Sequence, residues 1–417
     1  MNLYIFNVTE TSQAAAFGLG TYIRELMVAL RYSHINVCVV NLNSSKPQIK
    51  TEEIDGIRHW YFPTPISEMQ NLYSVKKTEQ YYRNIVYLFQ LHIIDRKKLI
   101  FHLNSYRCGK LAEELKKVFD CRVITTIHYF DWCFNLFGNV SRFRKILLSK
   151  GNYQHDKLYR KLDESYRIEK NLFELSDQII GLSENTRQIL QDDYQINPDK
   201  INIIYNGLSD RNAVTDKQIL RQKYLIPDIP IIFFVGRLGE IKGLTYALRA
   251  FKIVLDTLPH CHFIIAGNGA FDEYMNVCEG IWSHIIWTGL ISKDKLYDLY
   301  SIADIGVMPS FHEQCSYVAI EMMMHGLPVV GSNTTGLKEM IEDGVTGLHI
   351  PVIEYDDRAE IDTDLLAEKM LYLLQHPDER KRMGANARKR YETVYSAEIF
   401  RQNMLDFYNS LFNSTDL

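Results

Sequence analysis

The feature that most constrains the fold is an alternation of apolar runs with longer amphipathic runs, which starts twice along the chain. Residues 3–8 (LYIFNV) predict a strand, residues 21–31 a helix and residues 35–42 (INVCVVNL) a second strand. Strand, helix and strand in this order form a βαβ unit, which implies parallel pairing and a right-handed crossover. The alternation restarts at residues 231–235 (IIFFV). We therefore expect an α/β protein with two doubly wound, Rossmann-like domains.

A break in the pattern marks the predicted border between the two series. Pro227 and Pro230 follow a polar stretch and precede a fresh strand, as in a linker. A chain of 417 residues is long enough for two domains, and two such domains facing each other form a cleft for a ligand. The predicted divisions are residues 1–210, 211–390 and a terminal segment at 391–417.

Composition narrows the class of partner and the location. The net charge of −4 carries no basic surplus, so nothing indicates a nucleic-acid partner. Seven cysteines without a CxxC pair favour reduced thiols over a disulfide or zinc framework. The first residues lack a basic leader, and no apolar run approaches about 18 residues. The expected location is the cytoplasm, or the inner face of a membrane through surface contact.

Two glutamates, Glu313 and Glu321, stand eight positions apart in the stretch 309–331 (PSFHEQCSYVAIEMMMHGLPVVG). The pattern predicts a strand, a loop that carries Glu313, and a helix over 317–324 with Glu321 about two turns in. Eight helical positions add about 80° to two full turns, so both carboxylates can serve one site. Ser316 is a predicted N-cap, which leaves backbone N–H groups available to an anion. This combination suits a sugar nucleotide.

Arg237 and Lys242 lie in the loop between the strand at 231–235 and the next helix. Two fixed cations there suit a diphosphate, because charge-assisted hydrogen bonds can offset charge on a leaving group. A simple surface pair fits less well, since the helix dipole disfavours cations at that end. Gly236 and the GNG loop at 267–269 follow successive strands of the same series.

The first half offers weaker candidates. Gly18 and Gly20 either let the backbone approach a ligand or are ordinary loop glycines, because the third glycine of a dinucleotide fingerprint is missing. His128 lies toward the C-terminal end of the predicted strand at 121–131, the end where α/β sheets bind ligands. A lone histidine is also often structural. His312, beside Glu313, either tunes the site or is an ordinary loop histidine.

Residues 139–170 interrupt the alternation with a basic helical segment of nine Lys and Arg against four acidic residues. It is either a solvated helical face or a dock for an anionic lipid head group or acidic acceptor. The sequence offers no metal motif of the HExxH or clustered His/Cys kind. The single DxD, at 362–364, opens a predicted helix and is interpreted as an N-cap rather than a Mg²⁺ ligand.

Taken together, the motifs resemble family 4 of the retaining glycosyltransferases (GT4), which has the GT-B fold. The resemblance rests on E-x7-E within PSxxE…ExMxxGxPVV, on GRL-x3-KG upstream, and on SDQIIGLSENTR and INIIYNG before it. It covers nearly the whole chain and is weakest at 45–95 and 132–170. The sequence departs from the family where Cys315-Ser316 replaces the usual Phe-Gly.

The resemblance implies a role for each matching residue. Arg237 and Lys242 would bind the donor diphosphate, Glu313 the donor sugar, and Glu321 the ribose hydroxyls. The last helix, at about 396–412, would cross back to the first domain. The implied catalytic residues are His128, Arg237, Lys242 and Glu313. The implied donor-binding residues are Gly18, Gly20, Gly236, Gly267, Gly269, Gln314, Cys315, Ser316, Tyr317 and Glu321.

The expected activity is metal-independent transfer of a sugar, with retention, from a UDP- or GDP-sugar to an acceptor hydroxyl. The donor is a substrate, and no cofactor or metal is expected. The acceptor stays open among a glycan, a lipid-linked sugar, a peptide and a small molecule. The alternatives are a nucleotide-sugar epimerase or phosphorylase of the same fold, and a non-catalytic nucleotide-sugar-binding scaffold. Four intact site residues (Arg237, Lys242, Glu313 and Glu321) argue against the scaffold.

Overall fold

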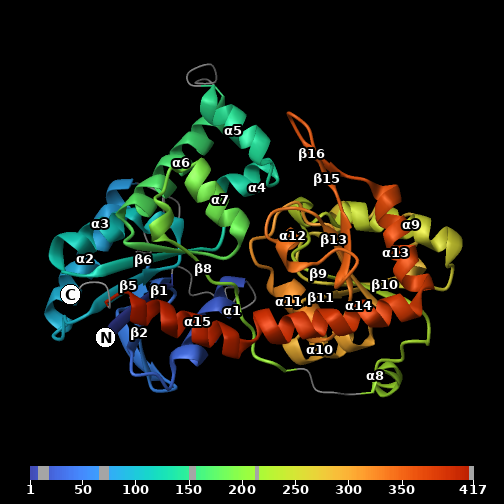
Figure 1. Cartoon of the computed structure of the whole chain (residues 1–417), viewed down its shortest axis with the longest axis horizontal. Helices are drawn as coiled ribbons and strands as arrows, with labels where there is room; N and C mark the ends of the chain where they lie inside the picture. Colours follow the sequence, from blue (N-terminus) through green and yellow to red (C-terminus); the bar gives the residue numbers. More distant parts are fainter. Residues whose placement is uncertain (8–17, 65–74, 150–155, 212–215, 413–417) are drawn as a thin grey trace. The chain divides into compact units, whose positions relative to one another are not determined.

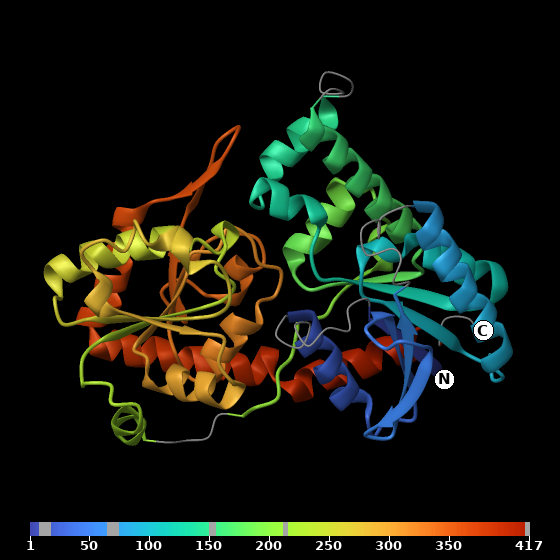
Figure 2. The same cartoon turned by 180° about the vertical axis from the view of Figure 1, so that it is seen from behind.

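The computed structural model describes residues 1–7, 18–64, 75–149, 156–211 and 216–412. The chain forms two compact units. Unit 1 comprises Met1–Trp132, Ser149–Gly207 and Ala397–Leu417, and unit 2 comprises Cys133–Leu148 and Leu208–Ser396. These borders differ from the predicted divisions, because Cys133–Leu148 joins unit 2. Each unit is a largely parallel sheet with helices on its faces (Figures 1 and 2), which confirms the predicted α/β class with two doubly wound domains.

Unit 1 is built on an eight-stranded sheet in the order β3-β4-β2-β1-β5-β6-β7-β8. Its strands are β1 (Asn2–Asn7), β2 (Asn36–Ser44), β3 (Lys50–Ile54), β4 (Ile57–Pro63), β5 (Leu99–Leu103), β6 (Arg122–Ile127), β7 (Gln178–Gly181) and β8 (Ile201–Ile203). All neighbours pair in parallel except β3 with β4. The order reverses between β1 and β5, because the chain builds outward from β1 to one side and then from β5 to the other.

Helices cover both faces of the unit 1 sheet, so its central strands are apolar on both sides. The helices are α1 (Gly18–Leu30), α2 (Val75–His92), α3 (Gly109–Val118), α6 (Lys157–Leu175), α7 (Glu184–Asp192) and α15 (Ala397–Ser410), with short turns η3 (Tyr106–Cys108) and η4 (Pro198–Lys200). Helices α2, α3 and α6 lie together on one face, and α1 lies beside α15 on the other (Figures 1 and 2).

Unit 2 is built on a six-stranded parallel sheet in the order β11-β10-β9-β12-β13-β14. Its strands are β9 (Ile231–Val235), β10 (His262–Ala266), β11 (Ile285–Gly289), β12 (Ile305–Met308), β13 (Val329–Ser332) and β14 (Gly347–Ile350). The strand order reverses between β9 and β12. A separate antiparallel hairpin, β15 (Val352–Glu354) with β16 (Ala359–Ile361), follows β14.

The main core of unit 2 packs α9 and α13 against this sheet. The unit 2 helices are α5 (Val140–Leu148), α8 (Lys217–Lys223), α9 (Leu244–Thr257), α10 (Lys293–Ile302), α11 (Tyr317–Met324), α12 (Leu337–Met340), α13 (Thr363–Gln375) and α14 (Pro377–Arg390), with short turns η5 (Glu240–Lys242), η6 (Phe271–Tyr274), η7 (Trp282–His284) and η8 (Tyr391–Tyr395). Helix α4 (Asp131–Leu136) runs from unit 1 into unit 2.

The segment 133–148 joins unit 2 through the tip of the β15–β16 hairpin. Arg142 Nη1 donates to the carbonyl of Asp357 at 2.8 Å, and Lys145 forms an ion pair with Asp356. The Asn139 side-chain amide donates to the carbonyl of Tyr355 at 3.0 Å. Two cations of the 139–170 segment therefore bind the hairpin, a contact that neither the solvated-face nor the anion-dock interpretation predicted. None of the helices described in the structure is both long enough and apolar enough to span a bilayer.

Candidate functional site

The two places where strand order reverses are the natural ligand positions of these sheets, because ligands of open α/β sheets bind beyond the carboxyl ends of the strands at such points. In unit 2 the reversal lies between β9 and β12, and in unit 1 between β1 and β5. The predicted site residues follow these strands or their neighbours.

The first charged contact at the unit 2 reversal joins Lys242 to Glu313. Lys242 lies in η5 after β9, and its Nζ donates to Glu313 Oε1 at 2.6 Å. The Ser310 hydroxyl donates to the same oxygen at 3.0 Å. The side chains of Lys242 and Glu313 are only 21% and 11% exposed, so solvent screens this pair little. No described residue bonds Glu313 Oε2, which leaves that oxygen available to a ligand.

The backbone of Glu313 is held by Thr335 and Gly336, which the sequence did not identify. Glu313 N donates to Thr335 Oγ1 at 3.0 Å, and that hydroxyl donates to Glu313 O at 2.7 Å. Gly336 N donates to the same carbonyl at 2.8 Å. A Cβ on Gly336 would lie 1.6 Å from the carbonyl oxygen of Gln314, so only glycine fits there. The loop after β13 therefore fixes the position of the first glutamate.

Arg237 lies exposed in a loop that packs against the GNG loop after β10. Leu238 N donates to the carbonyl of Asn268 at 2.9 Å, and a Cβ on Gly267 would lie 1.7 Å from the carbonyl oxygen of Gly236. Backbone packing thus accounts for Gly267, which was predicted to bind the donor. Gly269 is similarly close to Leu238. These glycines bring the two loops together and so set where Arg237 lies.

Helix α11 begins at Tyr317, as predicted, but two details differ. Ser316 occupies the N-cap position, yet its side chain makes no capping hydrogen bond. Glu321 lies four positions after Tyr317, little more than one turn into the helix rather than two. Its carboxylate is buried, with Oε1 paired to Lys293 and Oε2 accepting from Tyr300 at 2.9 Å. Gln314 and Cys315, also predicted to bind the donor, are buried as well.

His312 is buried beside this site. Neither of its ring nitrogens has a hydrogen-bond partner among the described residues. Burial lowers the pKa of the imidazole to about 4, so the ring is neutral at pH 7. The turn at Gly138 packs against it, because a Cβ there would lie 3.1 Å from His312 Cβ.

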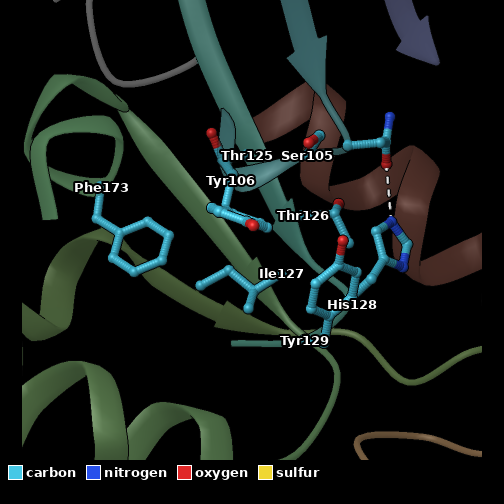
Figure 3. A pocket seen from close by; sticks show the side chains of 9 residues that line it. Ser105, Tyr106, Thr125, Thr126, Ile127, His128, Tyr129 and Phe173 are labelled. Carbon is cyan, nitrogen blue, oxygen red and sulfur yellow. Dashed lines mark hydrogen bonds between the residues drawn. The ribbon is translucent and has the colours of Figure 1, made fainter. Parts of the chain in front are cut away.

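In unit 1, β6 ends at Ile127, earlier than the predicted strand at 121–131, so His128 follows the strand directly. It lines a small pocket with residues of the β5 and β6 ends (Figure 3). Its Nε2 contacts Asn104 Oδ1 at 3.1 Å, the dashed line of Figure 3. The Asn104 amide donates to the carbonyl of Phe6 at 3.2 Å, so Oδ1 is the acceptor and Nε2 carries the proton. Burial lowers the pKa of His128 to about 3, so its Nδ1 is an acceptor at neutral pH.

A buried chain of hydrogen bonds supports His128. The ring of Tyr22 packs edge-on against His128, with centroids 4.6 Å apart. Tyr22 OH lies 3.2 Å from Thr126 Oγ1, which is 2.7 Å from His102 Nε2. His102 Nδ1 lies 2.7 Å from Tyr408 OH on α15. These polar groups satisfy one another without solvent, so the surroundings of His128 are rigid and neutral.

Gly18 and Gly20 lie in the first turn of α1 and not in a loop before it, which corrects the prediction of a glycine loop. The backbone N–H groups of a helix start are free, so these glycines still leave the backbone approachable. Sequence reasoning missed Asn104, although a polar residue directly after a buried strand was the available signal.

The DxD at 362–364 caps a helix. The Asp362 side chain accepts from Leu365 N at 3.0 Å at the start of α13, which confirms the N-cap interpretation. Within the described ranges no three His, Cys, Asp or Glu side chains come together as a metal site.

Two family models match the chain one after the other. Residues 18–211 match Glycosyltransferase Family 4, and residues 216–390 match Glycosyl transferases group 1. Among curated proteins, the chain is similar to an alpha-D-kanosaminyltransferase of Streptomyces kanamyceticus, with 25% identity over 240 residues. That match covers 56% of this chain and 60% of the relative, so the chain spans less than two thirds of it.

Solved structures share the fold over nearly the whole chain. Sucrose-phosphate synthase of Thermosynechococcus elongatus superposes with a TM-score of 0.77 at 21% identity, covering 99% of this chain and 100% of that one. HepE of Anabaena, solved with UDP and glucose, superposes with a TM-score of 0.73 at 14% identity, covering 98% and 100%. At these identities the likeness shows the GT-B fold.

Proposed function

This chain belongs to the family 4 and group 1 glycosyltransferases, and we propose that it transfers a sugar from a nucleoside diphosphate sugar to an acceptor hydroxyl with retention. The observation that carries the proposal is the Lys242–Glu313 contact at the strand-order reversal of unit 2. A cation and a carboxylate fixed side by side, with one carboxylate oxygen unused, suit a phosphate next to a sugar hydroxyl.

The proposed donor is a UDP- or GDP-sugar. Arg237 and Lys242 would bind its diphosphate, because two cations offset the charge that grows on the leaving phosphate. Glu313 Oε2 would accept from a hydroxyl of the sugar, and Glu321 from the ribose. The complex of HepE with UDP supports UDP as the first nucleotide to test.

In the proposed reaction the bond from the anomeric carbon to the phosphate oxygen breaks as the acceptor oxygen bonds to that carbon on the same face. The acceptor proton moves to the departing phosphate oxygen. His128 is neutral, so its proposed role is to accept a hydrogen bond from a sugar hydroxyl through Nδ1. Stabilisation of the leaving group by Arg237 and Lys242 is proposed to replace a metal ion.

The acceptor side of the proposal rests on the basic segment 139–170. Arg142 and Lys145 bind the hairpin, whereas Lys157, Arg160 and Lys161 at the start of α6 are exposed. These three cations suit an anionic acceptor or the head groups of an anionic membrane surface. Cytoplasmic location with peripheral contact at the inner face of a membrane is part of this proposal.

The test is a donor panel of UDP-, GDP- and ADP-sugars, read by thermal shift and by slow donor hydrolysis with and without EDTA. A donor at 100 times its Kd should stabilise the protein by about 2.7 kcal/mol. We expect one donor to shift the melting temperature and to be hydrolysed at the same rate with EDTA. Binding without hydrolysis or transfer would favour the non-catalytic scaffold, and hydrolysis abolished by EDTA would contradict metal independence.

A further inference from the structure

A second cavity of unit 1 lies at the end of the sheet opposite to His128. Its volume is about 190 Å³, and it lies between α2 and the first residues of β2 and β4. Ligands of open α/β sheets bind beyond the carboxyl ends of the strands, whereas this cavity is at the amino ends. It shares no described lining residue with the pocket beside His128, so it is a separate site.

The register of four strands builds the floor of this cavity. Tyr4 of β1 pairs with Cys38 of β2, which pairs with Arg58 of β4, so the three side chains form one row on a single face of the sheet. Glu53 of β3 continues the row, because it lies directly across the hairpin from Arg58. Cys38 has the smallest side chain of the row, which leaves space above β2.

Helix α2 and the adjoining Trp60 supply an aromatic wall. Phe89 of α2 packs on Tyr4 and Trp60, with ring centroids 5.8 and 6.1 Å away. The helix ends at His92, whose ring lies edge-on to Trp60 at 5.2 Å. Because the helix extends no further, the charged end of the row stays exposed to solvent.

The polar groups of the row have no partners in the described part of the chain. Arg58 forms no ion pair with a described carboxylate, not even with Glu53 across the hairpin. The Tyr4 hydroxyl makes no hydrogen bond to a described residue, and burial raises its pKa to about 12, so it stays a phenol that can donate and accept. An apolar wall with a few polar groups fixed around it is typical of a small-molecule site.

We propose that this cavity binds a monosaccharide that carries one acidic group, a carboxylate or a phosphate. Arg58 binds the acidic group through charge-assisted hydrogen bonds. Glu53 and the Tyr4 hydroxyl bind sugar hydroxyls, since each hydroxyl both donates and accepts. The apolar face of the sugar ring lies against the aromatic wall. A cavity of about 150 Å³ holds benzene, so this one accommodates a six-membered ring with small substituents.

Other small ligands match only part of the cavity. An inorganic anion pairs with Arg58 but leaves the aromatic wall in contact with water. An aromatic acid covers the wall but offers no donor to the Glu53 carboxylate. Both charged residues and the wall lie within 45–95, where the resemblance to GT4 is weakest and implies no site residue. The inference therefore does not depend on the proposed function.

The experiment measures Kd by calorimetry for glucuronate and glucose 6-phosphate, with glucose and inorganic phosphate as controls. We expect acidic sugars to bind more tightly than both controls. In Arg58→Met their affinity should fall roughly 10- to 100-fold, because hydrogen bonds to a charged group are lost. Lys50→Met is the matched control and should keep the wild-type Kd, since Lys50 lies on the opposite face of the same hairpin.

Melting temperatures without ligand check folding. If Arg58→Met unfolds, Tyr4→Phe removes a hydroxyl from the same row and should weaken binding of the acidic sugar roughly three- to tenfold. The Lys242→Ala variant separates this cavity from the diphosphate site proposed in unit 2. A sugar held at Arg58 binds Lys242→Ala with the wild-type Kd.

Four outcomes would overturn the inference. The first is loss of binding in Lys242→Ala with a wild-type Kd in Arg58→Met, because the sugar would then be held in unit 2. The second and third are equal affinities of the acidic sugars with glucose, or with inorganic phosphate. The fourth is no binding of either acidic sugar. Binding of only one of the two, weakened in Arg58→Met, supports the inference and identifies the acidic group.

Discussion

The two strand-order reversals carry different chemistry. In unit 2 the segments after β9 and β12 carry Arg237 and the Lys242–Glu313 ion pair, and helices α10 and α11 carry the Lys293–Glu321 ion pair. In unit 1 the corresponding end presents neutral groups, with His128 and His102 both kept uncharged by burial. A charged end suits phosphates, and a neutral polar end suits hydroxyls. The same sheet plan thus carries charged groups at one reversal and neutral groups at the other, and the difference lies in the segments that follow the strands.

The largest expected effect comes from removing the charges at the unit 2 end. Arg237→Ala and Lys242→Ala should each lower turnover by about 10²–10³-fold, since each removes a cation that is proposed to stabilise the leaving phosphate. Turnover at saturating donor measures this, and Lys252→Ala on the exposed side of α9 is the matched control. Near-wild-type turnover in both variants, with unchanged melting temperature, would show that neither Arg237 nor Lys242 takes part in catalysis.

The free energy of unfolding should depend on pH because of the buried, uncharged histidine His102 in unit 1. The pKa of His102 is lowered from 6.5 to about 3, so the folded state binds fewer protons than the unfolded state below pH 6.5. Its contribution to stability is complete above that value and is lost as pH falls toward 3, by about 2 kcal/mol between pH 7 and 5.

In His102→Gln the loss of unfolding free energy between pH 7 and pH 5 should therefore be smaller by about 2 kcal/mol. Urea unfolding at the two pH values measures it, and His34→Gln, at an exposed position of unit 1, should keep the wild-type loss. An unchanged pH dependence in His102→Gln would show that this histidine is not held neutral.

The smallest effect concerns His128. A neutral hydrogen bond contributes about 0.5–1.5 kcal/mol, so His128→Gln should lower turnover by roughly three- to tenfold. The pKa of about 3 places its ionisation below the working range, so both proteins should share one pH–rate profile between pH 5 and 8. A break in the wild-type profile that disappears in His128→Gln would instead make the histidine an acid–base group, and the two ends would no longer differ as described.

Local patterns predicted much of this molecule. The strand before Glu313, the loop that carries it and the helix that follows were all predicted from apolar runs and a stop at Gly326. The N-cap role of Asp362 was predicted in the same way. Such features are set by residues only a few positions apart, so they can be predicted from one sequence.

Long-range pairings were not predicted. Lys293 and Glu321 are 28 positions apart, and Lys145 and Asp356 are 211 apart, so no local pattern links them. The hairpin of β3 and β4 was also missed, because β3 (KTEEI) is a short polar edge strand without an apolar alternation. Ser316 looked like a cap, but only the three-dimensional surroundings decide where its hydroxyl bonds.

Helix α15 has a consequence for how the protein is made. It packs its buried Phe400, Met404, Phe407 and Tyr408 in unit 1, so the unit that begins at Met1 needs residues that follow all of unit 2 along the chain. At about 5–20 residues per second, a ribosome takes roughly 20–80 s to make the chain. For most of that time α1 has no partner at this face and His102 lacks the hydroxyl of Tyr408. Unit 1 can therefore complete its core only after Ser396, the last residue of unit 2, has been made, although unit 1 begins at Met1.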